Sequence, residues 1–294
     1  MTSTVVMTGA TGRLGQLVAA SLAISGVAWR AFARRPDAAR ALGAAEVVAG
    51  DFGSASQLDL AMAGMHCVIL ISGDDPRQDA QEIAVVNAAA RAGVRRIVKL
   101  SAQSAGLNPP ASFGRKHILV EQVIENSAAK HGFTWTFVRP VFFQQSFLLF
   151  ADSVRNSGKI ILPGGKGACA FVDARDVADC LVKVATQDGH AGKIYTLTGP
   201  QARTFAQAAA VIGTERGKPV GYIAPPAWLA KIVLPKASGM PRWLAMEVID
   251  LLQAIARGGQ ANVTPDVQML LGRAPRNFDA FVKDHLEAFR PLKN

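Results

Sequence analysis

The chain has 294 residues, of which 50% are hydrophobic and 18% charged, and its formal net charge is +10. This apolar content is sufficient for a full hydrophobic core, which excludes an intrinsically disordered protein. No segment reaches the roughly 18 uninterrupted apolar residues of a membrane span. The basic residues are scattered and form no stripe with interleaved aromatic side chains. We therefore expect neither a membrane nor a nucleic acid as a partner.

The three cysteines, Cys67, Cys169 and Cys180, lie far apart and form no Cys-x-x-Cys pair. This spacing predicts neither a disulfide framework nor a structural metal site. No basic and apolar leader of the secretory kind precedes the first apolar run. We expect a cytoplasmic protein that is a monomer or a homodimer.

Short apolar runs alternate with helical patterns from residue 4 to about residue 139, which predicts an α/β fold with helices on both faces of a parallel sheet. The expected strands are residues 4–8, 28–33, 46–49, 67–72, 96–101 and 134–139. The expected helices between them are residues 13–25, 54–63, 78–92 and 112–130.

The pattern changes after Pro140, where glycine and proline become frequent. A strand and helix pattern returns at residues 168–198, and helices interrupted by prolines follow. We therefore expect a cofactor-binding domain over residues 1–150, to which residues 168–198 return. A smaller, mostly helical lobe over residues 151–294 is expected to bind the substrate.

The first expected strand leads directly into a glycine-rich turn, and an apolar helical pattern follows that turn. Glycines let the backbone bend sharply and approach a pyrophosphate, which the N–H groups of the next helix bind. The G-x-x-G-x-x-G spacing in this context predicts a Rossmann-type, doubly wound parallel sheet that binds a dinucleotide, although a purely structural turn has to be weighed against it. The expected cofactor contacts in the turn are Gly9, Thr11, Gly12, Arg13, Leu14 and Gly15.

The end of the second expected strand bears on the choice between NAD and NADP. An acidic residue there would hydrogen-bond the adenosine ribose of NAD. The chain instead has Arg34 and Arg35, and Arg34 with support from Arg35 or Arg13 can clamp a 2′-phosphate. We therefore expect NADP(H) as the cofactor, against the alternative of two ordinary surface arginines.

Three further strand ends complete the expected cofactor site. Asp51 and Phe52 follow the third strand, where an adenine would lie, although Asp51 is also a candidate turn cap. Ser72 and Ser101 stand at the ends of the fourth and fifth strands. Ligands of open α/β sheets bind at these carboxyl ends, so we expect both serines to face the nicotinamide.

These motifs resemble the NmrA-like group of atypical short-chain dehydrogenases, which includes quinone reductases, triphenylmethane reductases and, more distantly, isoflavone reductases. The resemblance covers most of the chain and rests on residues 8–15, 94–101, 117–140, 171–178 and 195–199. It implies an NADPH-dependent oxidoreductase. It does not name a substrate.

One expected feature of short-chain dehydrogenases is missing, namely the acid–base tyrosine with a lysine four residues later. Tyr195 and Tyr222 are the only tyrosines, and neither has this lysine. The resemblance places His117 at the corresponding functional position, as in the quinone-reductase-like branch. Glu121 lies one helical turn away, where its carboxylate would orient the imidazole and raise its pKa. We expect His117 to donate a proton or a hydrogen bond, with a surface His–Glu pair as the equal alternative and no metal site.

The missing tyrosine favours acceptors whose reduced form is a stabilised anion, such as quinones. Four phenylalanines after the sixth strand are consistent with a flat substrate, or equally with a core between the lobes. They are Phe142, Phe143, Phe147 and Phe150. We expect hydride transfer from NADPH to a quinone-like or other conjugated small molecule.

Two other functions remain open. One is a non-catalytic NADP(H)-sensing regulator that binds a partner protein, which the missing tyrosine motivates. The other is a biosynthetic reductase or isomerase whose substrate fills the second lobe against Trp228, Met240 and Trp243.

Overall fold

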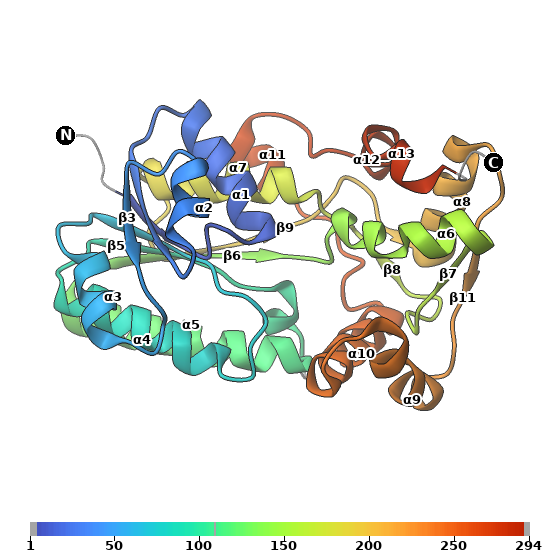
Figure 1. The fold of residues 1–294 in the computed structure, drawn as a ribbon, viewed down its shortest axis with the longest axis horizontal. Coiled ribbons are helices and arrows are strands. Elements are labelled where there is room, and N and C mark those ends of the chain that lie inside the picture. The colour runs from blue at the N-terminus through green and yellow to red at the C-terminus, as the bar shows by residue number, and fades with distance from the viewer. Residues whose placement is uncertain (1–4, 109, 291–294) are drawn as a thin grey trace. The chain divides into compact units, whose positions relative to one another are not determined.

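The computed structural model describes residues 5–108 and 110–290, which group into two compact units (Figure 1). The first unit comprises the described residues of 1–102, 115–139 and 177–195, and the second comprises those of 103–114, 140–176 and 196–294. This division differs from the expected boundary at residue 150, because residues 140–176 cluster with the later part of the chain. The second unit is also as extensive as the first, and not a smaller lobe.

A seven-stranded sheet forms the framework, with the strand order β3-β2-β1-β4-β5-β6-β9. The strands are β1 (Val5–Thr8), β2 (Trp29–Ala33), β3 (Glu46–Ala49), β4 (Cys67–Leu70), β5 (Arg96–Leu100), β6 (Thr134–Pro140) and β9 (Lys193–Leu197). All neighbouring pairs from β3 to β6 are parallel. The order reverses between β1 and β4, which is the switch point of a doubly wound sheet. The predicted Rossmann-type fold class is confirmed.

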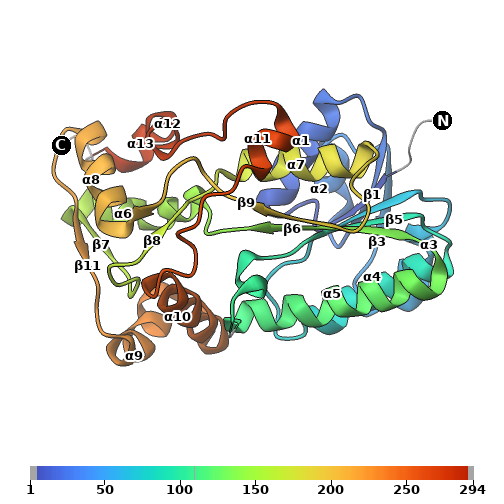
Figure 2. The same cartoon turned by 180° about the vertical axis from the view of Figure 1, so that it is seen from behind.

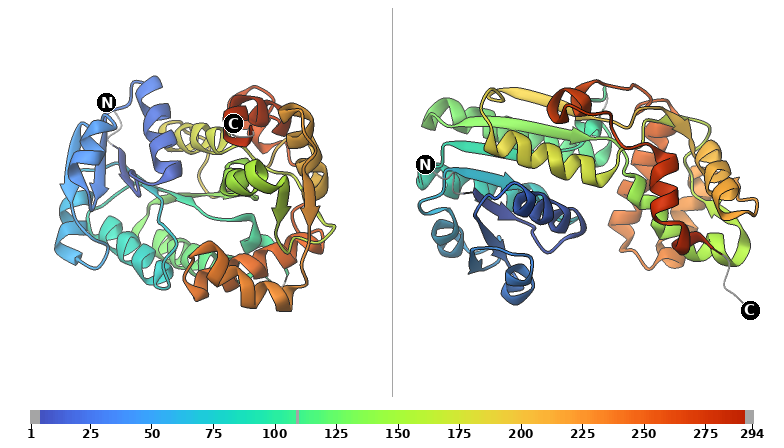
Figure 3. Two further views of the ribbon diagram at one scale, coloured as in Figure 1. Left: turned by 45° about the vertical axis from the view of Figure 1, so that its right-hand side comes forward. Right: turned by 90° about the horizontal axis from the view of Figure 1, so that it is seen from above.

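Helices cover both faces of this sheet (Figures 1 and 2). One face carries α3 (Ala55–Met62), α4 (Gln78–Arg91) and α5 (Ser112–His131), and the other carries α1 (Arg13–Ile24), α2 (Pro36–Ala41) and α7 (Ala174–Thr186). The further views keep α1 and α7 on the same side (Figure 3). Apolar side chains from α3, α4, α5 and the strands form one buried cluster, which includes Leu58, Val85, Ile97, Ile124 and Phe137. Burial on both faces explains why these strands are nearly continuous apolar runs.

The predicted strands and helices agree with the structure to within about two residues, which is the usual uncertainty of element ends. Residue 4, the predicted start of the first strand, lies outside the described residues. β4 and β5 end at Leu70 and Leu100, so Ser101 follows β5 directly and Ser72 follows β4 after Ile71. Among the described residues, no helix has the length and apolar content needed to cross a membrane.

The second unit combines short helices with two small sheets. β8 (Ala168–Cys169) pairs with β10 (Arg203–Thr204) antiparallel, and β7 (Lys159–Ile161) pairs with β11 (Gly221–Ile223) parallel. The helices are α6 (Ala151–Ser157), α8 (Phe205–Arg216), α9 (Ala227–Ser238), α10 (Arg242–Ala256), α11 (Asp266–Leu271), α12 (Phe278–Asp284) and α13 (Leu286–Phe289), together with the 3₁₀ segments Gln103–Gly106 and Gln144–Phe150.

Two of the four phenylalanines, Phe142 and Phe147, pack against other aromatic rings of this second unit. The ring of Phe147 is fully buried, and its centroid lies 4.8 Å from that of Phe278 and 5.1 Å from that of Phe171. Phe142 also makes an edge contact with Phe171 and Phe205. Phe142 and Phe147 therefore belong to a group of packed rings, which agrees with the core alternative for these two residues, whereas Phe143 and Phe150 are only partly buried.

We expect Phe147→Ala to lower the free energy of unfolding by about 3–5 kcal/mol, since it removes a fully buried ring from a close-packed core. Leu149→Ala is the matched control, because Leu149 lies in the same 3₁₀ segment and is 55% exposed. Its effect should stay within about 0.5 kcal/mol. Urea denaturation of both variants measures the difference, and equal effects would contradict the assignment of Phe147 to the core.

Candidate functional site

The glycine turn between β1 and α1 is held by close backbone contacts. Gly9 has φ of +67°, and a Cβ on it would lie 2.7 Å from the carbonyl oxygen of Ile71. A Cβ on Gly15 would lie 2.2 Å from the carbonyl oxygen of Gly9. Both distances are shorter than any real Cβ contact, so a side chain at either position would force the backbone apart. The two glycines let α1 begin directly above the end of β1.

The turn also leaves room for a ligand at the start of α1. Gly12 precedes this helix without any side-chain cap, and its own surface is exposed. A Cβ on Gly12 would have only the Gly9 carbonyl oxygen within 4 Å, at 3.2 Å. Thr11, Arg13 and Leu14 are at least partly exposed around it. The uncapped N–H groups and the helix dipole suit a phosphate at this place.

The end of β2 carries two exposed arginines. Arg34 follows β2 directly, and Arg35 precedes α2. Within the part of the chain that the structure describes, neither guanidinium forms an ion pair with a carboxylate. Two free cations at the end of the second strand suit a negatively charged group on the adenosine ribose.

Asp51 and Phe52 lie at the end of β3, and both have contacts within the first unit. Asp51 Oδ1 accepts a hydrogen bond of 2.9 Å from the backbone N–H of Gly53, as a turn-stabilising aspartate does. The ring of Phe52 is half-buried against Phe32, with centroids 5.8 Å apart. Asp51 therefore stabilises this turn, which is the alternative role that the sequence analysis gave it. Its second carboxylate oxygen remains available to a ligand.

The ends of β1, β4 and β5 are linked by polar contacts. The hydroxyl of Thr8 donates to the carbonyl oxygen of Ile71 at 2.6 Å and accepts from its N–H at 2.9 Å. The hydroxyl of Ser72, one residue further, donates to Glu82 Oε1 at 2.5 Å. Glu82 in turn pairs with Lys99 of β5. The structure therefore brings Ser72 beside the glycine turn and connects it to β5.

Ser101 follows β5 and its hydroxyl oxygen is buried without a hydrogen-bond partner. Its backbone N–H is used, since it donates to the carbonyl oxygen of Val138 at 2.7 Å. A buried hydroxyl without a partner is unusual in a folded protein. It marks a position where a bound polar group would supply the missing hydrogen bond.

His117 lies on α5, but its surroundings differ from the expected ones. Glu121 forms a two-armed ion pair with Arg139 of β6 and is not available to the imidazole. The partner of His117 Nδ1 is Lys99 Nζ, at 3.1 Å. Burial lowers the pKa of His117 well below its ordinary value, and the cations Lys99, Arg139 and Lys116 lower it further. The predicted His117–Glu121 pair with a raised pKa is wrong, because Arg139 outcompetes the imidazole for the carboxylate.

Residues 9–188, more than half of the chain, match the NAD(P)H-binding family. The chain belongs to the NAD(P)H-binding family. The sequence is 35% identical to a (4-alkanoyl-5-oxo-2,5-dihydrofuran-3-yl)methyl phosphate reductase of Streptomyces griseus, over 98% of this chain and 99% of that protein. It is 32% identical to an NAD(P)H azoreductase of Xenophilus azovorans, over 97% and 99% of the two chains.

The fold has close counterparts as well. The NADPH-dependent quinone oxidoreductase of Escherichia coli in complex with NADPH superposes with a TM-score of 0.88 at 28% identity, over 96% of this chain and 99% of that one. These findings confirm the NmrA-like resemblance and the prediction of an NAD(P)H-dependent oxidoreductase. The matched range includes the glycine turn and the strands and helices that surround it.

The sequence interpretation missed two residues of the site, Lys99 and Glu82. Both are essentially fully buried, with side chains 0% and 1% exposed. The sequence does contain a signal, since Lys99 interrupts the apolar run of a strand that is covered on both faces. A buried lysine needs a carboxylate partner, but the identity of that partner depends on how α4 packs.

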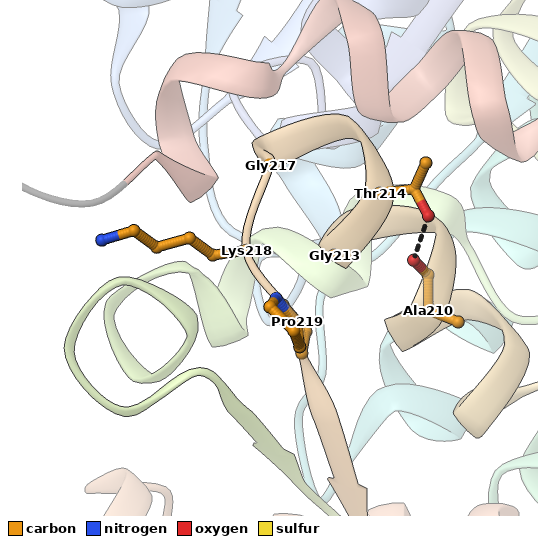
Figure 4. A pocket seen from close by; sticks show the side chains of 7 residues that line it. Ala210, Gly213, Thr214, Gly217, Lys218 and Pro219 are labelled. Carbon is orange, nitrogen blue, oxygen red and sulfur yellow. Dashed lines mark hydrogen bonds between the residues drawn. The ribbon is translucent and has the colours of Figure 1, made fainter.

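A surface hollow in the second unit does not have the features of an active site (Figure 4). It lies at the end of α8 and is lined by Ala210, Gly213, Thr214, Gly217, Lys218, Pro219 and Val220. The hydroxyl of Thr214 is bonded to the carbonyl oxygen of Ala210 at 3.1 Å, and the Lys218 side chain extends away from the helix (Figure 4). No polar side chains converge there, as a specific ligand site requires.

We expect Gly15→Ala to weaken NADPH binding by about tenfold or more, because the new methyl group would collide with the Gly9 carbonyl and displace the start of α1. Ala20→Ser is the matched control, since it adds one atom at an exposed position of the same helix. Isothermal titration of both variants with NADPH measures the effect. Unchanged affinity in Gly15→Ala would contradict a cofactor role for this turn.

Proposed function

We propose that this NAD(P)H-binding protein uses NADPH to reduce a quinone-like or other conjugated small molecule. The observation that carries the proposal is the buried imidazole of His117, in a chain in which neither tyrosine has the lysine four residues later. Its lowered pKa keeps the ring neutral near pH 7, so it is a poor proton donor. Acceptors that delocalise the charge they gain need little acid catalysis and suit such a site.

The relatives support this substrate class. The names of two of them specify an azo and a quinone acceptor, both of which are conjugated groups. Bound NADPH supplies the hydride. In our proposal the protein's own residues orient the two reactants.

The roles of the individual residues follow from their positions. We assign the pyrophosphate to the turn of Gly9, Gly12 and Gly15, whose following helix offers uncapped N–H groups. Arg34, supported by Arg35, is assigned to the 2′-phosphate. Asp51 and Phe52 are assigned to the adenine, on the basis of the free carboxylate oxygen and the half-buried ring.

The nicotinamide side of the site is assigned to Ser72, Ser101 and His117. Ser101 has a buried hydroxyl without a partner, and Ser72 is fixed by its bonds to Glu82 and Gln78. His117 is assigned a hydrogen bond to the acceptor or to the nicotinamide ribose. We also propose a cytoplasmic location, which the three free, buried cysteines support because such thiols persist in a reducing compartment.

The purified protein should oxidise NADPH in the presence of benzoquinones, naphthoquinones or azo dyes. We expect turnover of these acceptors to exceed that of an unconjugated ketone of similar size by roughly tenfold or more. Such a ratio needs only a small difference between the activation free energies of the two reductions. Loss of the NADPH absorbance measures the rate. Binding of NADPH without turnover of any conjugated acceptor would contradict the proposal and favour the regulator that senses NADP(H).

Arg34→Asp should weaken NADPH binding by about tenfold to a hundredfold, since a charge-assisted hydrogen bond to the 2′-phosphate contributes roughly 1.5–3 kcal/mol. NADH binding should change much less, because NADH has no phosphate there. Arg40→Asp is the control, as Arg40 lies on the neighbouring helix α2 and is also exposed. Equal losses for the two cofactors would contradict the assignment of Arg34.

A further inference from the structure

The first unit contains a buried group of three polar side chains, of which the proposed reaction uses only His117 directly. Lys99 on β5, Glu82 on α4 and His117 on α5 come together beside the carboxyl end of β5. All three side chains are buried. A buried ion pair in a Rossmann-type sheet costs desolvation energy, and replacing it with apolar residues is often neutral or stabilising. Stability alone therefore gives no reason for this group.

The hydrogen bonds of Glu82 indicate that its side chain is ionised. Its Oε1 accepts from the hydroxyl of Ser72 at 2.5 Å and from Gln78 Nε2 at 3.3 Å, and its Oε2 accepts from Lys99 Nζ. An ionised carboxylate only accepts hydrogen bonds, and three donors point at this one. Glu82 is thus stabilised as an anion and Lys99 as an ammonium ion.

The ammonium group of Lys99 has three N–H bonds and no acceptor capacity. One N–H donates to Glu82, a second to the carbonyl oxygen of Leu100 at 3.2 Å, and the third points at His117 Nδ1 at 3.1 Å. Because Lys99 can only donate, Nδ1 must accept and cannot carry a proton. The proton of the neutral imidazole is therefore on Nε2.

The other charged groups around His117 also favour the neutral form of its ring. Glu121, on the same helix, is neutralised by Arg139 of β6. Lys116, also on α5, donates to the carbonyl oxygen of Asp75 at 3.3 Å. A proton on His117 would add a further positive charge beside Lys99, Arg139 and Lys116. Burial and these three cations account for the lowered pKa of His117.

We propose that Lys99, held by Glu82, is a positioning residue that fixes His117 as the neutral tautomer with its hydrogen on Nε2. This inference rests on the proposed reductase function and assigns His117 one task in it. His117 presents a single hydrogen-bond donor at the edge of the sheet where such folds bind their ligands. It stabilises the oxygen or nitrogen that becomes negatively charged in the acceptor, without giving up its own proton.

With His117 as a hydrogen-bond donor only, the hydride, the electrons and the proton of the reduction each have a defined source. The acceptor gains the hydrogen and both electrons of the hydride, and NADPH becomes NADP⁺. The resulting anion takes its proton from water and not from His117. A neutral imidazole that acts as a hydrogen-bond donor is an established form of electrostatic catalysis.

The first test uses ¹⁵N NMR of histidine side chains in the protein without cofactor, where ring nitrogen shifts distinguish the two tautomers and the imidazolium ion. The chain has five histidines, and His117→Gln identifies the signal of interest. We expect a neutral ring with hydrogen on Nε2 from about pH 8 to about pH 5.5, although an ordinary histidine is mostly protonated at the lower value. A ring with hydrogen on Nδ1, or an imidazolium ion at neutral pH, would overturn the inference.

The second test is the double variant Lys99→Met/Glu82→Gln, which removes both charges together and leaves no buried charge unpaired. We expect the His117 signal to show both tautomers and to titrate at a higher pH than in the wild type. Arg96→Met is the control, since Arg96 is on the same strand but pairs with the exposed Asp188. An unchanged His117 signal in the folded double variant would overturn the role of Lys99.

Turnover provides the readout that links the tautomer to function. The wild-type kcat with a quinone should vary by less than about threefold between pH 6 and pH 8, whereas that of the double variant should follow the titration of His117. The NMR measurement on the protein without cofactor is independent of turnover. A protein with the predicted tautomer but no reductase activity contradicts the proposed function alone, whereas an active enzyme with a different tautomer contradicts the role of Lys99 alone.

Discussion

The close backbone approach at the β1–α1 turn is the constraint on which the first unit depends. Gly15 lies so near the carbonyl oxygen of Gly9 that a Cβ would come within 2.2 Å of it, and Gly9 is similarly close to Ile71. These contacts set the start of α1 directly at the end of β1 and beside the end of β4. The hydroxyl of Thr8 fixes the same junction by bonding both backbone groups of Ile71. The N-terminal end of α1, which we assign to the pyrophosphate, is therefore held in place by rigid elements, as a pre-organised site requires.

A second junction, built from charges, extends this site toward β5. Ser72 follows Ile71, bonds Glu82, and through Glu82 is connected to Lys99 and His117. The polar path thus runs from the glycine turn to the helix that carries the imidazole. A satisfied buried network has little freedom to rearrange, because each broken bond would leave a polar group unpaired in a medium of low dielectric constant. We infer that this network gives the site its fixed geometry, where typical relatives in the superfamily rely on a tyrosine and a lysine.

The local parts of this architecture could be predicted from the sequence. The alternation of apolar runs and helical patterns gave six strands of the sheet, since strands buried on both faces need continuous apolar residues. The glycine spacing pointed to the turn because only glycine tolerates such a close approach. The predicted pairing of His117 with Glu121 was wrong because it, too, was based only on local spacing. A four-residue helical spacing shows that two side chains are neighbours, but it cannot show that Arg139 from β6 competes for the carboxylate.

The fold class, the glycine turn and the absence of the usual tyrosine could all be predicted without a structure, because they depend on local periodicity and on residue type. The surroundings of His117 and the packing of Phe147, in contrast, depend on contacts between residues far apart in the sequence. Lys99 and Glu82 are 17 residues apart and meet only when α4 packs against β5. Phe147 contacts Phe278, and the two residues are too far apart in the sequence for a local pattern to predict this contact. The protonation state of His117 follows from such long-range contacts, since burial and charge depend on every element packed around the ring.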